Sequence, residues 1–193
     1  MAIINIKSKE RKPAALLFFM FFSIVSATIT GASVRDAVFL TQFDKSYLPV
    51  MFITIAVVMA GVIALYKKLT AGQDQIFVIS ISGALFSVSL FLLQSNLSGL
   101  FIPVLYIWME VVTILSIFQF WILAGEIFNA RQAKRIFTLL GAGGSFAGMG
   151  AGYGIKPFVS TFGSENLLFL TIFFIGISVV MAQMLRPFRM SRK

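Results

Sequence analysis

One carboxyl group, that of Glu110, lies within an apolar run long enough to form a membrane helix. It stands nine residues into the run Phe101–Leu123, which is about 13 Å deep at about 1.5 Å per residue. Tyr106 and Thr113 share its helical face. Ionisable groups in hydrocarbon are costly and commonly mark ion or substrate paths. Two interpretations remain open: a group in a watery cavity that binds a cation, a proton or a positive part of a substrate, or a carboxyl paired structurally or kept protonated by burial.

A second polar face lies in the first apolar run. Hydroxyl side chains recur there at helical spacing, at Ser23, Ser26, Thr30 and Ser33. Such a stripe either lines an aqueous path or makes interhelical hydrogen bonds. Arg35 and Asp36 follow it at the outer end of the run. They form a simple rim pair, or Arg35 meets an anion that enters from outside.

Two residue types that often carry enzymatic chemistry, His and Cys, are missing. The sequence has no His and no Cys, which removes the imidazole base, the thiolate nucleophile and the commonest metal ligands. No nucleophile–base set and no metal-binding cluster stands out in the sequence. We therefore expect neither an enzyme nor a bound cofactor or metal.

The composition indicates an integral membrane protein. Of the 193 residues, 59% are hydrophobic and 12% are charged, and the mean hydropathy is +0.95. Soluble domains carry about 25% charged residues. A membrane helix needs about 20 apolar residues, and six runs qualify in what we interpret as a single domain over residues 1–193: 14–33, 48–66, 76–94, 101–123, 137–155 and 166–185.

The basic residues predict the orientation of these runs. With the N-terminus inside, the inner segments hold 13 of the 16 Lys and Arg residues. Only Arg35, Lys45 and Lys156 then fall outside. Basic loops stay cytoplasmic, so six crossings with both termini in the cytoplasm are expected. The net charge of +9 thus indicates topology and contact with anionic membrane lipids, and no nucleic-acid partner is expected.

Internal regularities add two expectations. The first three runs and the last three are offset by about 90 residues and lie in opposite orientations, as in the inverted three-helix repeats of major-facilitator halves. Gly144, Gly148 and Gly152 recur every four residues. This small-xxx-small pattern is typical of close helix packing.

The segment Tyr106–Gly144 resembles the ATP/ADP translocase family of nucleotide transporters. The similarity includes the Tyr-x-x-x-Glu of Tyr106 and Glu110, the aromatic Gln119-Phe120-Trp121, an Ala-Gly-Glu element at 124–126 and an Ala-Lys-Arg element at 133–135. The run Arg35–Leu40 is similar to the family's exit from its first helix.

The resemblance implies a major-facilitator-like fold whose first and fourth helices line a path for nucleotide exchange by alternating access. It also implies a bacterial inner-membrane location. Basic groups suit phosphates. The expected substrate-binding residues are Arg35, Glu110, Tyr106, Thr113, Ser26 and Thr30. The expected gating residues of the cytoplasmic loop are Glu126, Lys134 and Arg135.

The sequence departs from the family in length and in one motif. The family has about twice as many spans in one chain, and Gly125 replaces an Asn of its motif. We expect a transporter-like half that pairs with a second six-helix half, either a copy of itself or another subunit. The alternative is a non-transporting anchoring subunit of a larger membrane complex.

Overall fold

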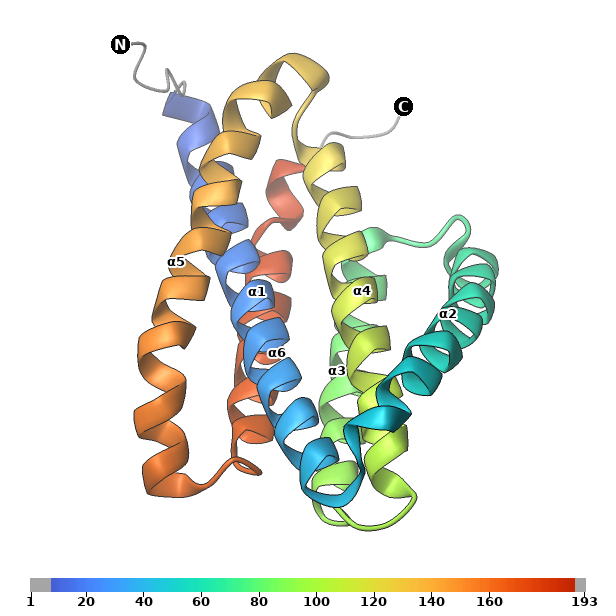
Figure 1. Ribbon diagram of the computed structural model, residues 1–193. Helices are drawn as coiled ribbons and strands as arrows, with labels where there is room; N and C mark the ends of the chain where they lie inside the picture. The colour runs from blue at the N-terminus through green and yellow to red at the C-terminus, as the bar shows by residue number, and fades with distance from the viewer. Residues whose placement is uncertain (1–7, 190–193) are drawn as a thin grey trace.

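The computed structural model describes residues 8–189, together with their side chains except those of residues 8, 9, 130, 131 and 133–135. This part of the chain is helical and contains no strand (Figure 1), which confirms the all-α prediction. Six long helices are joined by short connections: α1 Ser8–Gln42, α2 Leu48–Thr70, α3 Gln75–Gln94, α4 Phe101–Ile127, α5 Ala130–Phe162 and α6 Leu167–Met184. The short 3-10 helices η1 (Lys45–Tyr47) and η2 (Arg186–Phe188) precede α2 and follow α6.

Five of these helices are long and apolar enough to cross a membrane: α1, α2, α3, α4 and α6. They indicate a multi-pass membrane protein. The helix outside this group is α5, whose sequence carries glycine in place of large apolar residues along much of its length. It nevertheless runs beside α1 along the bundle, and the start of α1 and the end of α6 lie at the same end (Figure 1).

Two helices extend well beyond the apolar runs that predict them. α1 continues to Gln42, so Arg35 and Asp36 lie within a helix and not at its exit. α5 continues past Pro157 to Phe162, and the hydroxyls of Ser160 and Thr161 donate to the Pro157 carbonyl. Hydropathy marks the part of a helix that suits hydrocarbon, whereas backbone hydrogen bonding continues until a residue interrupts it.

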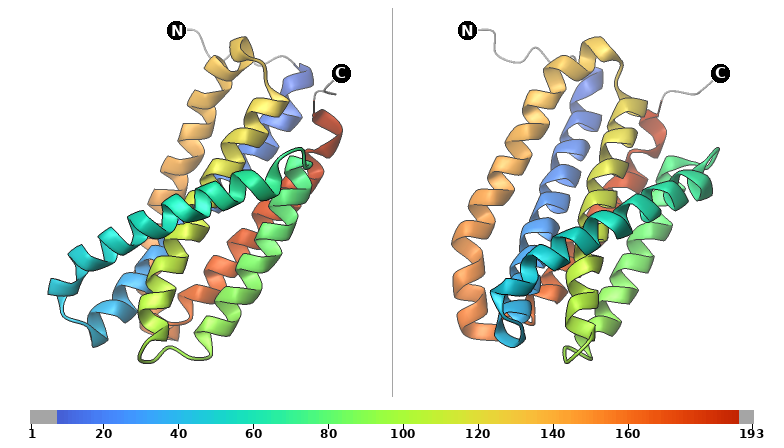
Figure 2. Two further views of the ribbon diagram at one scale, coloured as in Figure 1. Left: turned by 90° about the vertical axis from the view of Figure 1, so that its right-hand side faces the viewer. Right: turned by 45° about the vertical axis from the view of Figure 1, so that its right-hand side comes forward.

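The contacts between the helices define how the bundle is arranged. α1 contacts α4, α5 and α6, and α3 packs against α4 and α6. α1 and α4 therefore lie side by side in the middle, with α6 and α3 behind them, and α5 and α2 stand at opposite edges, α5 beside α1 and α2 beside α4 (Figures 1 and 2). Small residues permit the closest approaches, as at Gly83, where an added Cβ would lie 2.4 Å from a methyl of Val179.

The outer position of α2 leaves most of its surface uncovered. In the most apolar 18-residue window of each span, 11% of the residues are buried in α2 and 50% in α1. α2 leans away from the bundle as it approaches Thr70, and a short connection then returns the chain to α3 (Figures 1 and 2). A helix this apolar and this exposed suits a lipid or protein surrounding.

Candidate functional site

Arg35 of α1 makes ion pairs with two carboxylates. Its Nε lies 2.9 Å from Oδ1 of Asp36, the next residue along the same helix. Its Nη1 pairs with Oε1 of Glu110 on α4, 75 positions away in the sequence. The long α1 positions this guanidinium because it continues past the hydroxyl stripe and carries Arg35 alongside α4. Sequence analysis named these three residues, and the structure brings them together.

Tyr106 completes this group, which we call the Arg35 cluster: Arg35, Asp36, Tyr106 and Glu110. The Arg35 guanidinium carbon lies 4.4 Å from the centroid of the Tyr106 ring. An arginine at this distance from an aromatic face is held by a cation–π attraction. The ring itself is buried and packs 4.8 Å from that of Phe39, centroid to centroid. Tyr106 therefore fixes the guanidinium while leaving its N–H groups to the carboxylates.

The cluster is partly shielded and carries mixed charge. The Arg35 side chain is 11% exposed, that of Glu110 is 26% exposed and that of Asp36 is 51% exposed. The cluster sets one guanidinium against two carboxyl groups. An incoming anion would therefore have to compete with the carboxylates for Arg35, while a cation could bind to the exposed carboxylate directly.

The other predicted substrate residues lie deeper, between helices. The Thr30 hydroxyl lies 2.9 Å from that of Thr171 on α6, and it also donates to the Ser26 carbonyl. Ser26 is buried as well. Thr113, with Thr28, lines a cavity of about 10 Å³ between α1, α4 and α6. That is the space of about one water molecule. The Thr30–Thr171 contact joins α1 to α6, and the structure does not bring Ser26, Thr30 or Thr113 into the Arg35 cluster.

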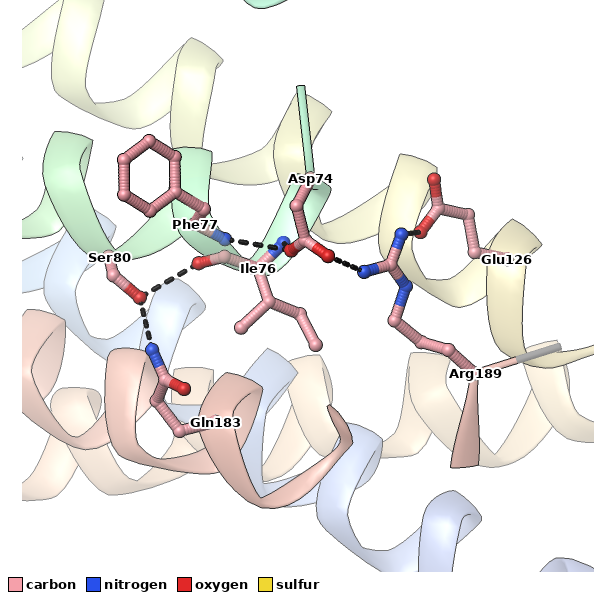
Figure 3. A network of polar contacts seen from close by, with 7 residues as sticks. All are labelled: Asp74, Ile76, Phe77, Ser80, Glu126, Gln183 and Arg189. Carbon is pink, nitrogen blue, oxygen red and sulfur yellow. Dashed lines mark hydrogen bonds and ion pairs between the residues drawn. The ribbon is translucent and has the colours of Figure 1, made fainter. Parts of the chain in front are cut away.

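Glu126, predicted as a gating residue, belongs to a second charged group near the end of the bundle where α6 ends. Its Oε2 lies 2.9 Å from Nη2 of Arg189, and Nη1 of Arg189 pairs with Asp74 (Figure 3). Asp74 caps α3, accepting hydrogen bonds from the backbone N–H groups of Ile76 and Phe77 at 2.8 and 3.0 Å. Arg189 therefore connects the start of α3 to the end of α4.

The hydrogen bond from the Phe77 backbone lowers the pKa of Asp74 below its usual value, and the Arg189 guanidinium lowers it further. Burial by itself would raise the pKa of Asp74, but the hydrogen bonds and the Arg189 charge outweigh it. Close by, the Gln183 amide of α6 donates to the Ser80 hydroxyl of α3 at 2.6 Å (Figure 3). Sequence analysis missed Asp74 and Arg189. An Asp directly before an apolar helix does signal an N-cap, but nothing in the sequence points to a partner 115 positions away.

The predicted gating pair Lys134 and Arg135 lies in the first turns of α5, and their side chains are outside the described part of the structure. This helix begins with a capping box, in which Asn129 and Gln132 exchange hydrogen bonds. The Gln132 amide also donates to Glu10 of α1 at 2.8 Å. The first turns of α1 and α5 are thereby connected.

The three glycines predicted for close packing have different surroundings. A Cβ added to Gly144 would lie 3.1 Å from the ring of Phe21 on α1. A Cβ added to Gly148 or Gly152 would meet nothing within 4 Å in the described chain. Close packing within the chain is therefore found at Gly144. The other two glycines line an open hollow of about 630 Å³ between α1 and α5.

Comparisons with protein-family models, curated proteins and solved structures found no match for this chain.

Proposed function

We propose that this protein is a six-helix half of a transporter of the major-facilitator type, related to the ATP/ADP translocases. Paired with a second half, it moves a nucleotide or another anion by alternating access. The observation that supports this most directly is the Arg35 cluster, a partly exposed set of charges joining α1 to α4. Charged groups within apolar helices commonly belong to substrate or ion paths.

The arrangement of the helices supports the pairing. α1 and α4 carry the cluster, α5 and α2 flank this pair at its two opposite edges, and α3 and α6 lie behind it (Figures 1 and 2). α2 is largely uncovered and α5 presents an open glycine face. A second half seated on α2 and α5 would enclose a central path between the two halves, as in inverted-repeat transporters. In this proposal α5 is the sixth crossing and both termini lie in the cytoplasm of a bacterial inner membrane.

Arg35 would be the group that changes partner during transport. A guanidinium in an apolar surrounding needs a counter-charge at every stage. Without substrate, Glu110 and Asp36 provide it. Phosphate oxygens would replace Glu110 when the substrate binds, since Arg pairs with phosphate by charge-assisted hydrogen bonds. Tyr106 would hold the guanidinium in place during the exchange.

A second candidate function is a non-transporting subunit that anchors or completes a larger membrane complex. Two observations favour it: Arg35 is already paired with two carboxylates, and the cavity lined by Thr28 and Thr113 holds about 10 Å³. In this case the cluster would be a structural link between α1 and α4. The uncovered faces of α2 and α5 would then bind other subunits.

Nucleotide exchange in proteoliposomes distinguishes the two functions. The purified protein, with any partner that copurifies in mild detergent, is reconstituted with ADP inside, and entry of labelled ATP is measured. We expect ADP-dependent uptake that Glu110→Gln reduces at least tenfold. Glu165→Gln removes an exposed carboxylate from the α5–α6 connection and should leave uptake unchanged. A folded assembly that transports neither nucleotide nor phosphate would contradict the transporter and favour the anchoring subunit.

A further inference from the structure

The departure of α2 from the bundle creates an apolar groove. It lies between α2, α3 and α4 and has a volume of about 510 Å³. Its walls include Leu65 and Leu69 of α2 and Ile81 and Leu85 of α3, all of them exposed. Small-molecule pockets have volumes of about 300–1,000 Å³, so the groove is large enough for part of a lipid.

Two polar atoms on the groove residues are buried and lack a hydrogen-bond partner within the described chain. They are the Tyr66 hydroxyl and the side-chain nitrogen of Gln119. The other end of the Gln119 amide is occupied, because its oxygen accepts from the Ser82 hydroxyl at 3.0 Å. A buried donor without an acceptor is unfavourable. Both atoms have almost no exposed surface, so a ligand in the groove does not contact them, and the groove itself suits a ligand that is mostly apolar.

One end of the groove is polar, and two lysines that do not line the groove lie in the last turn of α2. Thr70 and Gln73 line this end, where α2 ends and the connection to α3 begins. Lys67 and Lys68 lie in the last turn of α2 and are exposed. Basic residues at the end of a membrane helix attract anionic lipid headgroups. The positive charge of these lysines thus favours a ligand with an anionic headgroup.

We propose that this groove binds one anionic phospholipid. An acyl chain lies along the leucine and isoleucine side chains, and Lys67 and Lys68, in the last turn of α2 beside the groove, attract the headgroup. The proposal requires that the chain lies in a membrane, and it does not depend on transport.

Native mass spectrometry tests the preference for charge. The full chain is purified in mild detergent and stripped of lipid, then titrated with phosphatidylglycerol or with phosphatidylcholine of the same acyl chains. We expect one phosphatidylglycerol per chain, bound about 10–30-fold more tightly than phosphatidylcholine. The double variant Lys67→Gln/Lys68→Gln should lose most of this preference. Lys45→Gln, an exposed lysine before the opposite end of α2, is the matched control and should keep it.

Variants of the groove test the location. Tyr66→Phe removes a buried hydroxyl that a ligand in the groove does not contact, so it is the conservative control and should bind phosphatidylglycerol like the wild type. Leu85→Trp fills the groove and should abolish the one-lipid complex, with folding checked by gel filtration. Equal affinity for the two lipids, or unchanged binding by Leu85→Trp, would overturn the proposal. A partner helix occupying the groove would overturn it too, and would be seen as protein mass replacing the lipid.

Discussion

The guanidinium of Arg35 has one partner on its own helix and one on α4, and the two ion pairs contribute differently to the stability of the folded bundle. Asp36 stays beside it whatever the tertiary structure, because the two are neighbours on α1. Glu110 meets it only when α1 and α4 have packed together. The Arg35–Glu110 pair therefore stabilises the packing of α1 against α4. Its contribution to the free energy of unfolding can be measured as a coupling energy.

A double-mutant cycle on Arg35 and Glu110 measures this coupling. Glu110→Gln and Arg35→Gln should each destabilise the protein by about 1–2 kcal/mol, between the values for exposed and fully buried pairs. The double variant should lose less than the sum of the two, because neither charge is then left alone. Thermal unfolding in detergent gives the three values. Additive losses would show that the two side chains do not interact.

Asp74 makes the stability of the protein sensitive to acid. Its pKa is lowered in the folded protein, so its contribution is complete above its unfolded pKa of about 3.9. The contribution is lost as the pH falls through the folded value. We expect the melting temperature to fall below about pH 4 in the wild type and to fall less in Asp74→Asn, since Asn still caps a helix.

The Arg189→Gln variant is the companion measurement. It removes the contribution of Arg189 to the lowered pKa and leaves the backbone hydrogen bonds from Phe77 and Ile76 in place. Its acid sensitivity should therefore lie between those of the wild type and Asp74→Asn. A wild-type protein and an Asp74→Asn variant with the same dependence on pH would contradict this account.

At the scale of the helices, contact between α3 and α6 depends on Gly83. A Cβ there would lie 2.4 Å from a methyl of Val179, so Gly83→Ala should destabilise the protein by about 1–3 kcal/mol through overpacking. Gly176 of α6 has nothing within 4 Å of an added Cβ. Gly176→Ala should therefore be neutral or stabilising, since Ala favours a helix by up to about 1 kcal/mol over Gly. Unfolding temperatures in detergent compare the two, and equal effects would contradict the packing.

The helices could be predicted from sequence more completely than the contacts between them. Apolar runs located all six helices, because membrane helices require long stretches without charge. They did not locate the ends of α1 and α5, where the chain stays helical beyond the apolar part. Glu110 and Arg35 could be singled out because charge is rare in such runs, but their pairing depends on how α1 and α4 pack. The Asp74–Arg189 pair could not be found, since it joins a helix cap to a segment beyond α6.

At the scale of the whole molecule, the proposed second half gives Gly148 a role that the isolated chain does not. Nothing in the described chain lies within 4 Å of a Cβ at this position. Gly148→Leu should therefore leave the folded chain intact and disrupt its association with a partner on α5. The mass of the assembly in mild detergent measures this. Gly176→Leu, at an equally open glycine of α6, is the control and should preserve the assembly.

The central place of α1 also has a consequence for synthesis. Arg35 and Glu110 are 75 residues apart, so at about 5–20 residues per second the ribosome needs about 4–15 s to make Glu110 after Arg35. During that interval the part of α4 that carries Glu110 does not yet exist. Asp36, adjacent on the same helix, is the counter-charge available to Arg35 from the moment α1 leaves the ribosome. The pair within α1 thus accompanies the arginine through membrane insertion, and the pair with α4 follows once the bundle has assembled.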